Sequence, residues 1–202
     1  MTTVADSPFR ATVRGLLRDR LLDAAAGVVE TEGWSGVTMS RLAETVGVSR
    51  QTVYNEIGSK PALGQALVLR ELERFLEVVR RALEAHDDAA TAFEAAIGAA
   101  LRRGAQSPLL TAVLSSAHGG GNELLPWLTT ASEPLIERAT SVVLEAVTQR
   151  HGDQPLDSER LGVLVETVVR LVLSHVVAPG HRPDRTAADV AWLVRAVLAG
   201  PS

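Results

Sequence analysis

Apolar residues recur at three- and four-residue steps along almost the whole chain, the spacing of helices that bury one face. The stripe from Leu16 to Val29 predicts a first helix that ends at Gly33. Further helices are predicted over residues 39–46, 50–57, 61–85, 89–105, 109–117, 123–150, 159–177 and 184–199. Pro134 predicts a kink or break near residues 132–134. Strand-like alternation and fixed-period repeats are absent from the sequence, so the predicted fold is all-α.

The segment from residue 38 to 60, TMSRLAETVGVSRQTVYNEIGSK, predicts two short helices joined by a tight turn. Thr38 and Ser49 are suited to cap the two helices at their N-termini, and Gly47 to supply the turn. The apolar positions predict how one helix packs on the other. They are Leu42, Ala43, Val46, Val48, Val53 and Ile57.

The outward face of the second short helix is polar, and its side chains suit a DNA groove. Arg50 and Gln51 can form paired hydrogen bonds to base edges, and Thr52 can touch a thymine methyl group. Tyr54 and Asn55 can reach phosphates. The alternative is a solvated face of a small helical hairpin. The single lysine of the chain, Lys60, and its single tyrosine both lie in this segment, which favours a specific chemical role.

Residues 14 to 65 resemble the DNA-binding head of TetR-family transcriptional repressors. The likeness lies in Glu32-Gly33-Trp34, Val37-Thr38, Leu42-Ala43, Gly47-Val48-Ser49, Thr52-Val53-Tyr54 and Gly58-Ser59-Lys60. It implies a three-helix helix-turn-helix head over residues 10–60, joined by a long helix to a larger helical ligand-binding and dimerisation domain over residues 61–202. Ile57 departs from the pattern, because the family usually has an aromatic residue there.

The resemblance also implies roles for single residues of the head. Thr52, Tyr54 and Lys60 would hold phosphates, while Arg50 and Gln51 would lie near bases. The N-terminus of the helix after Lys60 adds a further phosphate site. The full set of expected DNA-binding residues is Thr38, Arg41, Ser49, Arg50, Gln51, Thr52, Tyr54, Asn55 and Lys60.

The net charge of −4 does not by itself indicate a nucleic-acid partner. Residues 1–60 hold seven basic and seven acidic side chains, so the acidity lies in the remainder, with thirteen and seventeen. Arg10, Arg14 and Arg18 are expected to follow a DNA backbone. One head would make few phosphate contacts, so we expect a homodimer on double-stranded operator DNA, with half-sites about 34 Å apart.

The helices predicted over 159–177 and 184–199 are too apolar for surface helices. The resemblance implies that they pair with the same helices of a second subunit, and plain packing in a monomer core is the alternative. The remaining body is expected to bind a small hydrophobic effector, such as a fatty acid, a long alkyl compound or a hydrophobic drug, which shifts the population of DNA-binding states. Ordinary core packing is again the alternative. The expected ligand-binding residues are Phe93, Ile97, Leu101, Leu114, His118, Trp127, Leu128, Leu171 and His175.

Several other functions find little support in the sequence. The chain has no cysteine, and its five histidines lack the i, i+4 spacing of a helical metal pair, so neither metal nor cofactor is expected. His118-Gly119-Gly120-Gly121 is similar to an oxyanion motif of hydrolases, but the partner motif Gly-x-Ser-x-Gly is absent. A hydrolase and a constitutive DNA-binding protein without effector remain as alternatives. No apolar run reaches about 18 residues, so a cytoplasmic protein without a membrane partner is expected.

Overall fold

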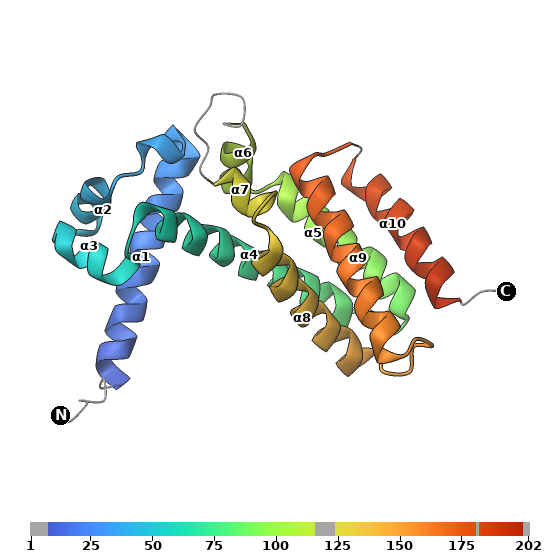
Figure 1. Ribbon diagram of the computed structural model, residues 1–202. Helices are drawn as coiled ribbons and strands as arrows, with labels where there is room; N and C mark the ends of the chain where they lie inside the picture. The colour runs from blue at the N-terminus through green and yellow to red at the C-terminus, as the bar shows by residue number, and fades with distance from the viewer. Residues whose placement is uncertain (1–7, 116–123, 181, 200–202) are drawn as a thin grey trace. The chain divides into compact units, whose positions relative to one another are not determined.

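The computed structural model describes residues 8–115, 124–180 and 182–199, and within these ranges it contains helices and turns but no strand (Figure 1). The predicted all-α fold is therefore confirmed. The helices are α1 (Pro8–Glu32), η1 (Trp34–Gly36), α2 (Met39–Val46), α3 (Arg50–Ile57), α4 (Lys60–Glu84), α5 (Ala89–Ala105), α6 (Pro108–Ser115), α7 (Leu125–Leu128), α8 (Glu133–Arg150), α9 (Ser158–Val177) and α10 (Pro183–Leu198).

The chain forms two compact units, and α4 begins in the first and ends in the second. The first unit comprises residues up to Val68 together with Pro108–Leu125, and the second comprises Leu69–Ser107 and the chain from Pro126 onward. The first unit thus contains α6 as well as the helix-turn-helix segment. The expected boundary between residues 60 and 61 stays a prediction about domains.

In the first unit, α1 packs against α2, α3 and α6. The two short helices begin and end where the sequence predicts. The Thr38 side chain accepts a hydrogen bond from the backbone N–H of Arg41, and the Ser49 side chain accepts one from Thr52. Gly47 ends α2 in the left-handed conformation, with φ of 78°, which glycine adopts without steric cost. Leu42 and Val53 are fully buried and join the two helices to the core of this unit.

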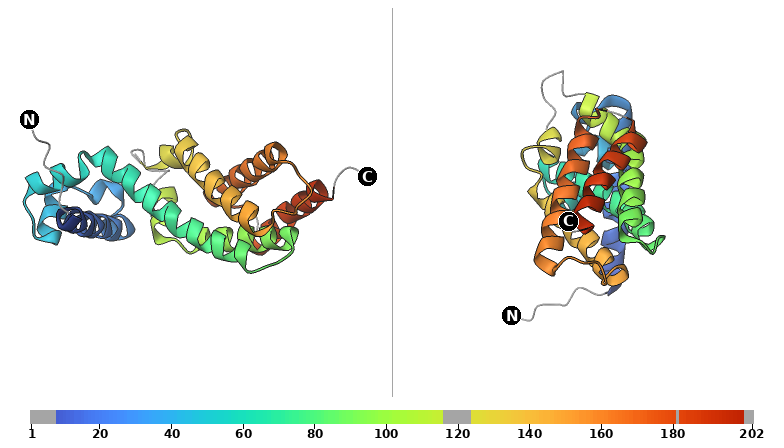
Figure 2. Two further views of the ribbon diagram at one scale, coloured as in Figure 1. Left: turned by 90° about the horizontal axis from the view of Figure 1, so that it is seen from below. Right: turned by 90° about the vertical axis from the view of Figure 1, so that its right-hand side faces the viewer.

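In the second unit, α10 packs against α5 and α9, and α8 packs against α9 (Figures 1 and 2). Alanine-rich α5 brings small side chains to this bundle, so neighbouring helices can approach closely. Phe93 is the largest side chain of the core and is 2% exposed. The apolar faces of α5, α8, α9 and α10 together bury one continuous cluster. This burial is the main force that holds the unit together.

A buried polar group lies at the point where α4 meets the end of α5. The Glu71 carboxylate is 6% exposed and accepts hydrogen bonds from Ser107 at 2.7 Å and Arg103 at 2.8 Å. Arg74 lies 3.4 Å away on the same helix. Burial of a charged group is unfavourable unless it is paired, and these partners meet that need.

A second buried polar side chain, His151, lies just after α8 and is 1% exposed. Its ring nitrogens lie 3.2 Å and 3.3 Å from the carbonyl oxygens of Asp87 and Leu83. Both carbonyls belong to the C-terminal end of α4 or the turn after it. His151 therefore meets backbone acceptors that have no partner inside the helix.

The break predicted at Pro134 is confirmed. α7 ends at Leu128, and α8 begins at Glu133 with Pro134 in its first turn, where the missing N–H of proline costs nothing. Within the described ranges, none of the helices is long and apolar enough to cross a membrane.

Candidate nucleic-acid interface

The outward face of α3 presents polar side chains in two pairs, each one helical turn apart. Arg50 Nη2 lies 3.3 Å from Tyr54 Oη, and its guanidinium carbon lies 5.5 Å from the centre of the tyrosine ring. Gln51 Nε2 donates to Asn55 Oδ1 at 2.9 Å. All four side chains are exposed. Because these pairs are local and exposed, they orient the polar groups along the helix while leaving them accessible from solvent.

The start of α3 places two hydroxyl groups beside this face. The hydroxyls of Ser49 and Thr52 lie 2.8 Å apart, and the Ser49 hydroxyl also caps the helix by accepting from the Thr52 N–H at 3.0 Å. The N-terminus of a helix attracts anions, because its N–H groups and dipole point toward them. The expected phosphate contact at Thr52 is compatible with this arrangement and stays a prediction.

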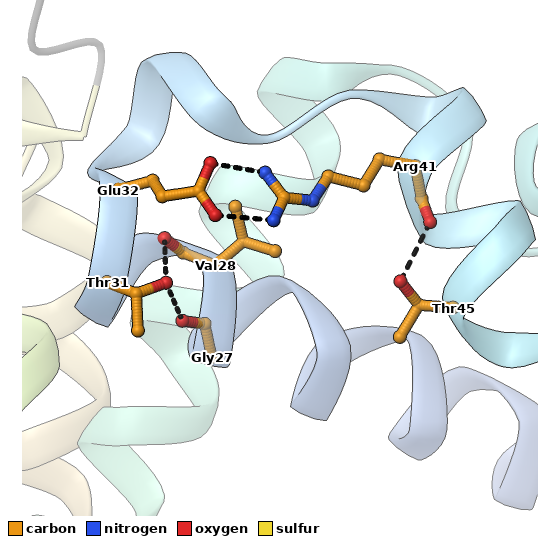
Figure 3. A network of polar contacts seen from close by, with 6 residues as sticks. All are labelled: Gly27, Val28, Thr31, Glu32, Arg41 and Thr45. Carbon is orange, nitrogen blue, oxygen red and sulfur yellow. Dashed lines mark hydrogen bonds and ion pairs between the residues drawn. The ribbon is translucent and has the colours of Figure 1, made fainter.

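Arg41 is bound to another part of the first unit. Its guanidinium donates two hydrogen bonds to the carboxylate of Glu32, which joins α2 to the end of α1 (Figure 3). The hydrogen bonds lower the pKa of Glu32 and raise the pKa of Arg41. Thr45 adds a hydrogen bond to the Arg41 carbonyl at 2.9 Å. No spacing in the sequence indicates this pairing, and a contact between Arg41 and DNA stays a prediction.

Two of the arginines expected near a DNA backbone lie beside the end of α3. Arg18 Nη1 donates to the Glu56 carbonyl at 2.9 Å, and Arg14 Nε lies 3.4 Å from the Glu56 carboxylate. The side chain of Arg10 lies outside the described residues. These contacts give Arg14 and Arg18 a structural role in holding α1 against α3.

Lys60, the first residue of α4, lies above the ring of Trp34 from η1. The ammonium nitrogen is 5.0 Å from the centre of the ring, within the range of a cation–π interaction. Lys60 is half-buried, whereas Trp34 is almost fully covered. The sequence placed Lys60 at the end of the helix-turn-helix segment but gave no sign that Trp34 supports it.

The expected ligand-binding residues fall into separate groups. Phe93, Ile97 and Leu101 are buried in the core of the second unit, and Leu171 packs against that cluster. The second unit also contains half-buried Trp127, buried Leu128 and half-buried His175, whereas half-buried Leu114 lies on α6 of the first unit. His118, with the glycine motif of the hydrolase alternative, lies outside the described residues. The assignment of these residues to one ligand site stays a prediction.

Ion pairs between charged side chains connect different helices of the second unit. Arg138 on α8 binds Glu73 on α4, and Arg102 on α5 binds Asp184 on α10, each at 2.8 Å. Arg170 pairs with Glu166, one helical turn away on α9, at 2.8 Å. In the described part of the chain, no three His, Asp or Glu side chains form a group that could hold a metal ion.

Two family models match the chain, one over each part of the sequence. Residues 21–67 match the model of bacterial regulatory proteins of the tetR family, and residues 88–196 match the C-terminal domain of the bacterial tetracyclin repressor. The HTH-type transcriptional regulator AlkX of Mycobacterium tuberculosis is 35% identical over 188 residues, which cover 93% of this chain and 87% of that protein.

Solved structures agree with the family models. The TetR-family repressor AlkX of Dietzia sp. strain DQ12-45-1b, implicated in the biodegradation of n-alkanes, is 29% identical with a TM-score of 0.74. The match covers 89% of this chain and 96% of that one. The repressor QsdR of R. erythropolis shares the fold at 24% identity and a TM-score of 0.64, covering 89% and 94% of the two chains. The chain therefore belongs to the TetR family of bacterial transcriptional regulators.

Proposed function

We propose that this regulator is a repressor that binds operator DNA as a homodimer and is released by a small hydrophobic effector. The exposed polar face of α3 carries the DNA-binding part of the proposal. Arg50 and Gln51 lie on this face with the donor groups that read base edges, and Tyr54 and Asn55 lie one turn further along. Family membership supports the same function, because the match to the tetR model includes this face.

Exposed apolar side chains on the last two helices support the dimer. Val163 on α9 is 64% exposed and Trp192 on α10 is 65% exposed, with Leu193 and Val197 about half exposed on the same helix. Solvent-exposed apolar groups of this size mark surfaces that associate. We propose that this face pairs with its copy in a second subunit, which places two heads on one operator.

The effector part of the proposal rests on the apolar character of the second unit and on the relatives. Phe93, Ile97 and Leu101 line the inner face of α5. The relative from Dietzia is implicated in n-alkane biodegradation, so we propose an alkane-derived molecule, such as a fatty acid, as the effector. A ligand that binds the second unit better in the released state lowers DNA affinity by its differential affinity for the two states.

Binding of DNA can be tested with the fragment upstream of the protein's own gene. We expect a discrete complex whose affinity falls with salt, because phosphate contacts release counterions. Arg50→Ala should lower the affinity for this fragment by roughly 5- to 150-fold, the loss of one good base contact. Arg81→Ala is the matched control, since Arg81 is an exposed arginine on α4 of the second unit, with a side chain 71% exposed. Equal affinity of wild type and Arg50→Ala would refute the assignment of α3.

The effector can be tested with palmitate and n-hexadecane as probes. A ligand of the folded protein raises the melting temperature by mass action and weakens the DNA complex at the same concentration. Phe93→Ala is expected to destabilise the protein, so Leu171→Met, which conserves volume, is the better variant for altered ligand preference. If neither probe changes melting or DNA affinity, palmitate and n-hexadecane are excluded as effectors, whereas the DNA-binding proposal stands.

A further inference from the structure

The Trp34 ring that lies under Lys60 is itself close to other residues of the first unit. The Trp34 ring that carries the Lys60 ammonium also faces Gly64, one turn along α4. A Cβ atom added at Gly64 would lie 3.3 Å from Cζ2 and 3.4 Å from Cη2 of this ring. A side chain at position 64 would therefore press on the same indole ring that lies under the Lys60 ammonium.

Glycine at position 64 makes room for Leu124. A Cβ atom at this position would lie only 2.6 Å from Leu124 Cδ2, closer than real Cβ contacts allow. Glycine is unfavourable inside a helix, so its presence here agrees with the need for a close approach. Leu124 is 1% exposed, which means that protein surrounds its side chain and it cannot turn away into water.

Leu124 also has a special place along the chain. It precedes α7 and is the last residue but one of the first unit, which ends at Leu125 before the chain enters the second unit at Pro126. Leu124 thus fills the space that the missing side chain of Gly64 leaves open, here called the Gly64 notch, and it lies two residues before the chain resumes in the second unit.

We propose that Leu124, Gly64 and Trp34 are positioning residues that set the place of the Lys60 ammonium for its contact with an operator phosphate. The proposal rests on the proposed function, because it assigns a task to the DNA contact of Lys60. Leu124 packs in the Gly64 notch and fixes the indole. The indole in turn fixes the ammonium by cation–π attraction. A side chain at position 64 displaces the ring or Leu124 and thereby moves the charge.

The test is a double-mutant cycle in the full chain, with the fragment upstream of the protein's own gene as DNA. Gly64→Ala should lower affinity about two- to tenfold, the range of a weakened cation–π support and phosphate contact. The slope of log affinity against log salt should become shallower by up to about 0.9. Leu124→Ala alone should also lower affinity, because the indole loses the side chain that fixes it. In the double variant the new Cβ at position 64 stands where Leu124 Cδ2 packs in wild type and lies against the ring in its place, so affinity should return to within about twofold of wild type.

The Lys60→Ala background separates positioning from a general disturbance of the head. There, Gly64→Ala should cause no further loss, because the charge that it displaces is gone. Gly27→Ala is the matched control, since Gly27 lies in helix α1 with open space where its Cβ would stand. Its DNA affinity should equal that of wild type.

Thermal melting of each variant shows whether it is folded, so that a loss of affinity is not caused by misfolding. If Gly64→Ala does not melt cooperatively, Trp34→Phe takes its place, because phenylalanine keeps a ring under Lys60 but attracts a cation less than tryptophan. Its loss of affinity should likewise vanish in the Lys60→Ala background. An equal loss with and without Lys60, or no loss in a folded variant, overturns the positioning role. If wild type does not bind the DNA, or Lys60→Ala binds it like wild type, the phosphate contact of the proposed function fails instead.

Discussion

The hydroxyl of Ser107 donates a hydrogen bond of 2.7 Å to the buried carboxylate of Glu71, across 36 positions of sequence. Ser107 is fully buried in the turn between α5 and α6. Glu71 lies on α4, three residues beyond the point where that helix passes from the first unit to the second. The contact therefore holds the turn after α5 against α4 within the second unit.

Removal of the Glu71 carboxylate should destabilise the protein strongly for a single substitution. Glu71→Ala leaves buried Ser107 and the Arg103 guanidinium without their acceptor, so we expect the free energy of unfolding to fall by about 2–3 kcal/mol. Urea unfolding followed by circular dichroism measures the change. Glu73→Ala is the control, because its pair with Arg138 is half exposed and should contribute at most about 1 kcal/mol. Equal losses in the two variants would contradict the prediction.

The pairing of Glu32 with Arg41 predicts a pH dependence of stability. The hydrogen bonds from Arg41 lower the pKa of Glu32 in the folded state, so this carboxylate releases its proton more readily than in the unfolded chain. The stabilisation is fully present above the ordinary pKa of glutamate and is lost as the pH falls through the lowered pKa. Glu32→Gln should therefore be less stable than wild type at neutral pH, and the difference should shrink in acid.

Urea unfolding of both proteins across this pH range is the measurement. In an Arg41→Gln background, Glu32→Gln should lose its pH-dependent effect, because the partner that lowers the pKa is absent. A difference that stays constant with pH would show that Arg41 does not determine the titration of Glu32.

Gly47 should be intolerant of other side chains for a reason of backbone geometry alone. Its φ of 78° is left-handed, and no atom lies within 4 Å of the place where a Cβ would stand. Gly47→Ala should lower the free energy of unfolding by about 1–2 kcal/mol through strain, with Gly47→Asn less harmful. Gly27→Ala, in an ordinary helical conformation, should instead be neutral or stabilising by up to about 1 kcal/mol. Thermal melting distinguishes these variants, and similar melting temperatures would refute the argument.

Charge on the apolar face of α9 and α10 should dissociate the proposed dimer. Trp192→Glu and Val163→Glu each place a carboxylate where the second subunit would exclude water, a burial that is very unfavourable without a partner. Sedimentation velocity should show monomers for both variants. Leu16→Glu provides a control, because Leu16 is 61% exposed but lies on α1 of the first unit. Dimers that persist in both α9 and α10 variants would place the interface elsewhere.

Local patterns in the sequence predict most of the helices. The helix predicted over residues 89–105 has the same bounds in the structure, because Asp88 caps it and its alanine-rich composition favours helix. The start of α1 at Pro8 lies earlier than the apolar stripe that begins at Leu16. Val13 and Leu16 are exposed, so the first turns of this helix bury no apolar stripe, and Leu16, which the pattern places at the start of the stripe, lies outside the core.

The contacts that position the candidate site are less accessible to sequence reasoning. Polar residues on the outward face of α3 follow from helical periodicity, and the structure exposes them as predicted. The cation–π contact of Lys60 with Trp34, and the approach of Trp34 and Leu124 to Gly64, join residues that are remote in sequence. Only the packing of the first unit brings these side chains together, so no spacing rule reveals them.

The capping of α4 by His151 has a consequence for how the chain folds during synthesis. The imidazole that meets the carbonyls of Leu83 and Asp87 is more than sixty positions further along the sequence. During synthesis, the last turn of α4 emerges long before this cap exists. Helices in proteins gain most of their stability from tertiary packing, and isolated helices are only marginally stable in water. We therefore expect a fragment that stops after α5 to fray at Leu83, and the long helix to become complete only once α8 has been made.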